Sequence, residues 1–287
     1  MMVKTGSATT GQELGYFNAS VPEAGAEVTD FAAVTAGLPD DVLRRPRRLA
    51  YHEIWVFTAG AGLAMIDFEF ITCEPGTVLH VRPGQVRQAP SPVDGAGVEA
   101  TIVLFAEEFP AHTTDVLSYL RAGPNAIHTG LPVALRSSMQ EVQRAYSEPH
   151  TDRRARDVLK LLLAVFVLRL AQYTPADASD ERDLYERFTA ELERSFATIR
   201  SADVYASRLG YTAKTLTRAC RIATGKTAKR LIDERVALEA KRLLADTRLT
   251  AAQIGTQLGF SEPTNFAKFF ARVVGSTTRE FRRRYRL

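Results

Sequence analysis

Cysteine is scarce in this sequence, because its 287 residues include only Cys73 and Cys220. Neither belongs to a Cys-x-x-Cys pair or stands among histidines, so the sequence offers no zinc finger, disulfide framework or cysteine nucleophile. No apolar run approaches the 18 residues that a membrane span needs; the longest, Leu161–Leu168, has eight. Lys4 is the only early charge, and no apolar stretch indicates a secretory signal. We expect a cytoplasmic protein without membrane contact.

The sequence also lacks the common catalytic motifs. It contains no Gly-rich phosphate loop, no serine nucleophile elbow and no paired carboxylates at a catalytic spacing. It has only five histidines, and no two of them form a His-x-His pair. We therefore expect a protein that is not an enzyme and that holds no metal or cofactor.

Charge is divided unevenly along the chain. The net charge is +4, yet the residues from Ser201 onward hold 18 Lys and Arg against 7 Asp and Glu, whereas the preceding residues hold 19 against 26. A solvated basic surface would also give such a count. Because the basic segment carries the helical motifs described below, the asymmetry favours nucleic acid as a partner.

The composition changes several times along the chain, and these changes predict the domains. Short β-branched and aromatic runs between Arg48 and Phe105, separated by Gly and Pro turns, indicate a β-sandwich or barrel. A linker is predicted at Thr174-Pro-Ala-Asp-Ala-Ser-Asp-Glu181. The predicted division is a flexible arm at 1–47, a β-barrel at 48–130, a helical segment at 131–174, a linker at 175–182 and a helical domain at 183–287.

The helix predicted from Ala155 to Tyr173 is apolar on two faces. One stripe contains Leu159, Leu163, Phe166 and Leu170, and a second contains Val158, Leu161, Val165 and Leu168. Such a helix needs two partners, which can be the β-domain and the same helix of a second subunit. We assign self-association to the first stripe and expect a homodimer. Burial of both stripes within one subunit is equally compatible with the pattern.

Two helix-turn-helix patterns lie in the basic segment. In the first, Ala206, Gly210 and Leu216 occupy the close-approach, turn and core positions, and Thr212 is the expected N-cap of the second helix. The outward face of that helix then carries DNA-contacting side chains, namely Lys214, Thr217, Arg218 and, one turn later, Arg221.

The pattern returns about 49 residues later, with Gly259 at the turn and Ser261 as the expected N-cap. Pro263 takes an early helical position, and Phe266 and Phe270 form a core pair. The outward face is then Thr264, Ala267 and Lys268. A helix from Thr227 to Ala245 joins the two elements and spans ~30 Å. This length predicts two recognition helices in adjacent major grooves, which are ~34 Å apart.

These motifs identify a resemblance to the arabinose-regulator (AraC/XylS) family of bacterial transcription factors. It rests on Leu216-Thr-Arg218, Gly225-Lys-Thr, Arg235, Ala240, Leu243-Leu244, Ile254, Gly259-Phe260-Ser261, Phe266, Phe270, Gly275 and Phe281-Arg282. By position, the resemblance implies DNA contacts from six of these seven outward residues, namely Lys214, Thr217, Arg218, Thr264, Ala267 and Lys268. Two departures are Gly255, where the family usually has Ala, and Ala267, where it often has Ser.

The N-terminal half is similar to the family's cupin-like effector-sensing barrel, through His52-Glu-Ile-Trp55, Gly60-Ala-Gly62, Pro75-Gly76 and Val81-Arg-Pro-Gly-Gln-Val86. The implied fold is α+β, with a β-barrel, flanking helices and an all-α DNA-binding domain. Such a barrel can hold a small organic effector. The expected effector-binding residues are His52, Trp55, Phe57, His80, Arg82 and Arg87, with an Arg favouring a carboxylate or phosphate.

The leading hypothesis is therefore a sequence-specific transcription regulator, activator or repressor, with double-stranded DNA, a small effector, a second copy and RNA polymerase as partners. Two alternatives remain. One is a metal-dependent cupin enzyme with an accessory DNA-binding domain, although the missing His-x-His pair and the cation Arg87 oppose it. The other is an effector-independent regulator whose barrel is filled by its own side chains.

Overall fold

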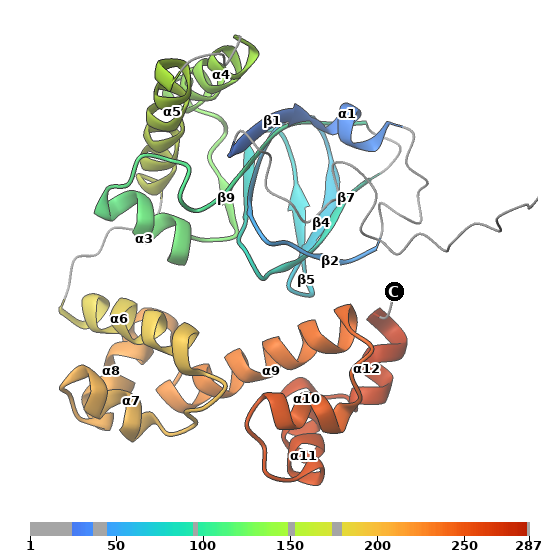
Figure 1. The fold of residues 1–287 in the computed structure, drawn as a ribbon, viewed down its shortest axis with the longest axis vertical. Helices are drawn as coiled ribbons and strands as arrows, with labels where there is room; N and C mark the ends of the chain where they lie inside the picture. Colours follow the sequence, from blue (N-terminus) through green and yellow to red (C-terminus); the bar gives the residue numbers. More distant parts are fainter. Residues whose placement is uncertain (1–24, 37–44, 94–96, 149–152, 174–179, 286–287) are drawn as a thin grey trace, which may run out of the picture. The chain divides into compact units, whose positions relative to one another are not determined.

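The computed structural model describes residues 25–36, 45–93, 97–148, 153–173 and 180–285 (Figure 1). They divide into two compact units, one within 1–44 and 48–174 and the other within 45–47 and 175–287. Most of the arm expected at 1–47 and most of the linker expected at 175–182 lie outside the described residues.

The N-terminal unit contains two sheets and three longer helices. Its elements are β1 (Ala26–Asp30), α1 (Phe31–Thr35), β2 (Arg47–Arg48), β3 (His52–Gly60), β4 (Gly62–Ile66), β5 (Glu69–Cys73), β6 (Thr77–Val81), β7 (Val86–Pro92), β8 (Val98–Phe105), α3 (Thr114–Ala122), β9 (Ala126–His128), α4 (Val133–Ser147) and α5 (Arg153–Ala171).

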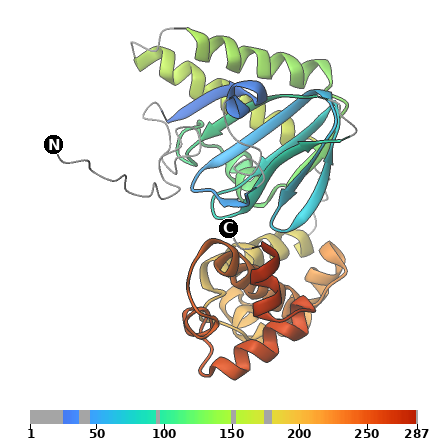
Figure 2. The same ribbon diagram turned by 90° about the vertical axis from the view of Figure 1, so that its right-hand side faces the viewer.

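A five-stranded sheet in the order β1-β8-β3-β6-β9 lies in the middle of this unit. Its alternate residues face opposite ways, as the period of two in a strand requires. Trp55, Phe57 and Leu79 face the four-stranded sheet, whose order is β2-β7-β4-β5. Ile54 and Phe105 face the other way and join the core formed with α3, α4 and α5. The central sheet is therefore buried on both faces, with the helices across one of them (Figure 2).

The strands form two sheets instead of the closed barrel expected from the sequence. The chain passes from one sheet to the other between β3 and β4. Gly60 has φ 73° there, and a Cβ on it would lie 1.4 Å from the carbonyl oxygen of Gly97, so no other residue fits this crossing. The mixed helix and sheet fold class is confirmed.

Residues 26–30, expected in a flexible arm, instead form an ordered edge strand. β1 pairs with β8 in antiparallel register, from Ala26 opposite Phe105 to Asp30 opposite Thr101. The side chain of Asp30 then accepts a hydrogen bond from the backbone N–H of Ala33 and begins α1. The sequence analysis missed this strand because it is only five residues long and only partly apolar.

The stripe of α5 that the sequence analysis assigned to self-association is buried within the subunit, and the other stripe is exposed. Leu159, Leu163, Phe166 and Leu170 are at most 3% exposed, because they pack within the subunit. Their assignment to self-association is therefore wrong. In the second stripe, Val158 is 49% exposed, Leu161 58% and Val165 41%. The periodicity alone could not say which of two equally apolar faces meets the sheet.

The C-terminal unit is all-helical. Its elements are α6 (Asp180–Ser195), α7 (Ala202–Leu209), α8 (Ala213–Thr224), α9 (Ala228–Asp246), α10 (Ala251–Gln257), α11 (Pro263–Val274) and α12 (Thr278–Tyr285). No helix among the described residues of either unit is long and apolar enough to cross a membrane.

The first helix-turn-helix element, α7 and α8, folds as its pattern predicts. Gly210 ends α7 at φ 82°, a left-handed conformation that strongly favours glycine. The hydroxyl of Thr212 accepts a hydrogen bond from the backbone N–H of Thr215, so Thr212 is the N-cap of α8. Leu216 and Ala206 are buried in a core shared with α6.

The second element, α10 and α11, differs from its prediction at one position. Gly259 takes φ 78°, as the turn requires. The N-cap of α11, however, is Glu262 instead of Ser261, and Pro263 is the first helical residue. Proline at that first position fixes where the helix begins, so the cap lies directly before it. Gly255 also has a role, since a Cβ there would lie 3.0 Å from the Cβ of Phe266.

Candidate nucleic-acid interface and effector site

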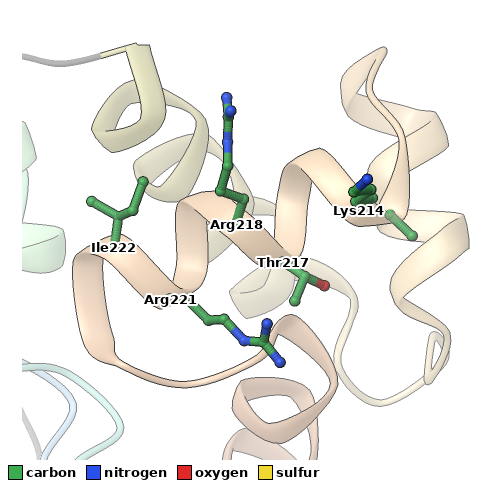
Figure 3. Close-up of a pocket in the computed structure, with 6 residues that line it drawn as sticks. Lys214, Thr217, Arg218, Arg221 and Ile222 are labelled. Carbon is green, nitrogen blue, oxygen red and sulfur yellow. The ribbon is translucent and has the colours of Figure 1, made fainter.

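One face of α8 presents the side chains expected to contact DNA (Figure 3). Lys214, Arg218 and Arg221 are exposed and Thr217 is half-buried. With Ala213 and Ile222 they line a hollow on the surface of the unit. The positions 214, 217, 218, 221 and 222 are three and four residues apart, so they lie on one side of the helix.

Ile222 is a member of this face that the sequence analysis missed. Its side chain is 63% exposed in a set of cations and a hydroxyl. An exposed apolar group on such a helix can contact the methyl group of thymine. Its helical spacing from Arg218 was the signal that could have found it.

Arg218 forms an ion pair within the protein. Its Nη2 atom lies 2.9 Å from Oε1 of Glu181, in the first turn of α6. The Arg218 side chain is 65% exposed and that of Glu181 is 30% exposed. Glu181 therefore competes with any other acceptor that approaches Arg218.

The outward face of α11 is less cationic than that of α8. Thr264, Ala267 and Lys268 are all exposed there, as predicted, and Asn265 is exposed beside them. Near the end of α11, Arg272 contacts the buried Asp233 of α9 at 3.2 Å, and Asp233 also holds Lys229 at 2.7 Å. The Arg272–Asp233 pair connects α11 to α9, the helix that joins the two elements, whereas Lys229 and Asp233 both belong to α9.

The residues expected to bind an effector are divided between the two faces of the central sheet. Trp55, Phe57 and Arg87 lie between the sheets. Arg87 forms a buried bidentate ion pair with Glu53, at 2.9 and 3.1 Å. The indole N–H of Trp55 donates to the same carboxylate at 3.0 Å, and the Arg87 guanidinium lies 5.4 Å from the Trp55 ring centre. This network satisfies a charge that would be costly to bury alone.

His52 and His80, expected to point into the barrel, lie on the opposite face, below α3. Nδ1 of His52 is 2.9 Å from Nε2 of His80. Burial and, to a smaller extent, the positive charge of Arg82 lower the pKa of His52 to about 3; the same causes hold the pKa of His80 well below its usual value. Both rings are therefore neutral at physiological pH. Strand alternation places them away from Trp55 and Phe57, so the six residues do not form one site.

Arg82 lies on the His-pair side and connects the sheet to α3. Its Nε donates to the backbone oxygen of Leu120 at 3.0 Å, and its Nη1 donates to Oδ1 of Asn125 at 2.7 Å. Leu120 and Asn125 were not singled out by the sequence, because contacts this far apart in the chain leave no local pattern.

The two cysteines are buried in different units, and burial raises the pKa of Cys73 to about 12 and that of Cys220 to about 11. Both thiols are therefore protonated at neutral pH and inert as nucleophiles. Within the described residues, no three His, Cys, Asp or Glu side chains gather as a metal site would require.

A comparison with known protein families agrees with the helical motifs. Residues 205–284 match the family described as a helix-turn-helix domain. The structure of ToxT from Vibrio cholerae O395 shares 11% identity and aligns over 92% of this chain and 99% of its own, with a TM-score of 0.49. ToxT of strain SCE256, solved with a bound unsaturated fatty acid, shares 13% identity over 90% of this chain and 94% of its own, with a TM-score of 0.46.

A regulator from Chromobacterium violaceum, described as containing an AraC-type DNA-binding domain, shares 23% identity. It covers 36% of this chain and 92% of its own, with a TM-score of 0.34. The sequence matches no curated protein. The matched segment contains α8, α9, α10 and α11, together with most of α7 and α12, and both turn glycines. The C-terminal unit therefore contains a helix-turn-helix domain, as its two sequence motifs predict.

Proposed function

We propose that this protein is a sequence-specific transcription regulator whose C-terminal unit reads double-stranded DNA and whose N-terminal unit binds a small organic effector. The observation that carries the proposal is the face of α8, where Lys214, Arg218 and Arg221 are exposed around a hollow. Guanidinium groups can bind guanine through two hydrogen bonds, and lysine neutralises phosphate.

The length of α9 supports simultaneous contact by both elements. The helix has 19 residues and spans ~29 Å at ~1.5 Å per residue. The major groove returns to the same side of B-DNA after ~34 Å. We therefore propose that α8 and α11 of one subunit occupy successive turns of the major groove, with α8 contributing more of the sequence preference.

Selection of binding sites from random DNA by the full-length protein tests this function. We expect enrichment of one sequence, and affinity that falls steeply as salt increases, because cations released from DNA accompany binding. The matched control is the double variant Lys214→Gln with Arg221→Gln, which should lose affinity for all sequences alike. If the wild-type protein enriches no particular sequence, the proposal is wrong.

The Glu181–Arg218 ion pair predicts a variant that binds DNA more tightly. Glu181→Gln removes the carboxylate that competes with DNA for Arg218, and exposed pairs of this kind contribute modestly. We expect affinity for the selected site to rise about twofold to fivefold. Fluorescence anisotropy measures it, with Glu186→Gln as the control, since Glu186 lies on the same helix but pairs with Arg182. Equal gains in both variants would mean that only net charge matters.

We also propose that the exposed stripe of α5 joins two subunits. Val158, Leu161 and Val165 are three and four residues apart, which is the spacing of a two-helix seam. Leu161→Glu should convert a dimer to a monomer at micromolar concentration, as measured by sedimentation velocity. Arg156→Glu, on another exposed face of α5, should leave the dimer intact. A dimer that survives Leu161→Glu contradicts this interface.

A further inference from the structure

Three buried polar atoms below α3 stand out in the N-terminal unit. They are Nε2 of His52, Nδ1 of His80 and the hydroxyl of Tyr119, and none has a hydrogen-bond partner within the described residues. The three side chains are only 1%, 1% and 4% exposed. A buried polar atom without a partner destabilises the folded state, and most buried polar atoms in proteins have a hydrogen-bond partner. Three such atoms on neighbouring rings indicate that something complements them.

The rings that carry these atoms stand side by side between the central sheet and α3. Phe105, His52, His80 and Tyr119 form a series in which successive ring centres are 5.1, 5.1 and 5.5 Å apart. Phe105 and the histidines come from β8, β3 and β6, and Tyr119 comes from α3. Two different layers of the unit therefore contribute polar atoms to the same place.

The hydrogen bond between the two imidazoles determines which donors and acceptors the outer nitrogens of the pair can supply to a ligand. A neutral imidazole has one N–H and one acceptor nitrogen, and the shared contact uses one nitrogen of each ring. Whichever ring donates, one of the outer nitrogens is an N–H and the other is an acceptor. The pair thus presents one donor, and the hydroxyl of Tyr119 can supply a second.

The charge at this place is positive. Among the causes that shift the pKa values of His52, His80 and Tyr119, the charge of Arg82 acts on all three and lowers each one, although burial raises that of Tyr119 overall. A positive potential in a buried site favours an anion over water or a neutral ligand. Two hydrogen-bond donors beside a guanidinium suit the two oxygens of a carboxylate.

We infer that His52, His80 and Tyr119, with Arg82 beside them, bind the carboxylate of a small organic acid below α3. This inference rests on the proposed effector role of the N-terminal unit, and it places the effector on the helix-covered face of the central sheet instead of between the sheets. The ligand would connect β3 and β6 to α3. Since α3 packs on α5, occupancy would also bias the helix whose outer stripe we assign to self-association.

Titration of the full-length protein with sodium acetate tests the site directly. The readout is the ¹⁵N chemical shift of the imidazole nitrogens, which reports the tautomer and hydrogen bonding of each ring. Acetamide at the same concentration is the neutral control, and sodium chloride matches ionic strength. Tyr119→Phe removes one donor and keeps the ring stack, whereas Tyr185→Phe, in the C-terminal unit, is the matched control.

We expect acetate, and not acetamide, to shift the resonances of His52 and His80, and Tyr119→Phe to weaken the effect about tenfold, as loss of a hydrogen bond to a charged group should. Tyr185→Phe should bind acetate as the wild type does. Shifts that are absent, or equal for acetate and acetamide, would mean that ordered water fills the site and would overturn the inference. DNA binding measured on the same samples separates the two proposals, since its persistence without acetate binding removes only the carboxylate site.

Discussion

Replacement of Arg218 by alanine should reduce affinity for the selected operator about tenfold to a hundredfold, because a bidentate arginine–guanine contact contributes ~1–3 kcal/mol of discrimination. The loss should be confined to operators that have the preferred base at one position. The Arg218→Ala protein should therefore bind operators with any base at that position equally well. Arg218 is suited to this role because its side chain is 65% exposed on the outward face of α8. Competition binding with operators altered one base pair at a time measures the effect.

Arg187→Ala is the matched control for this experiment. Arg187 is a partly exposed arginine of the same unit, but it lies on α6 and pairs with Asp183. Its removal lowers the positive charge equally, so we expect a small loss for every sequence and an unchanged base preference. If Arg218→Ala behaves in the same way, Arg218 contacts phosphate and the base assignment is wrong.

Glu53→Ala should lower the free energy of unfolding of the N-terminal unit by about 3–5 kcal/mol, since it leaves Arg87 charged and buried without its bidentate partner. Both side chains are at most 3% exposed, so water cannot replace the lost carboxylate. The indole N–H of Trp55 loses its acceptor as well. Trp55 is the only tryptophan of the chain, so its fluorescence during urea unfolding follows this unit selectively.

The double variant Glu53→Met with Arg87→Met distinguishes a structural ion pair from an effector-binding arginine. Removal of both charges should recover most of the lost stability, because apolar groups of similar size often replace a buried ion pair without cost. Glu99→Ala, an exposed carboxylate on β8, should leave stability unchanged. A double variant as unstable as Glu53→Ala would contradict this explanation of the network.

The sequence predicts the C-terminal unit well because its signals are local. Gly210 and Gly259 mark turns that need positive φ, and Thr212 caps the helix that follows it, so each position carries its own conformational requirement. Ser261 fails as a cap for an equally local reason, since Pro263 fixes the first turn one residue later. The ion pair between Arg218 and Glu181 leaves no such signal, because 37 residues separate its partners.

The orientation of the N-terminal site residues could not be predicted for a different reason. Strand alternation separates His52 from Trp55, but β3 is buried on both faces from His52 to Phe57, so hydrophobicity does not say which face meets the second sheet. The same ambiguity affected α5, where Leu159 and Leu161 lie in equally apolar stripes. In both elements, tertiary packing decides between two patterns that are equivalent in the sequence.

Methylation interference on the selected operator shows whether one subunit contacts two successive turns of the major groove. The experiment uses the variant Leu161→Glu, so that a single subunit occupies the DNA. Contact with two successive turns predicts two clusters of interfering guanines about 10 base pairs apart on one side of the duplex. A single cluster, unchanged when Thr264 and Lys268 of α11 are replaced by alanine, would contradict it.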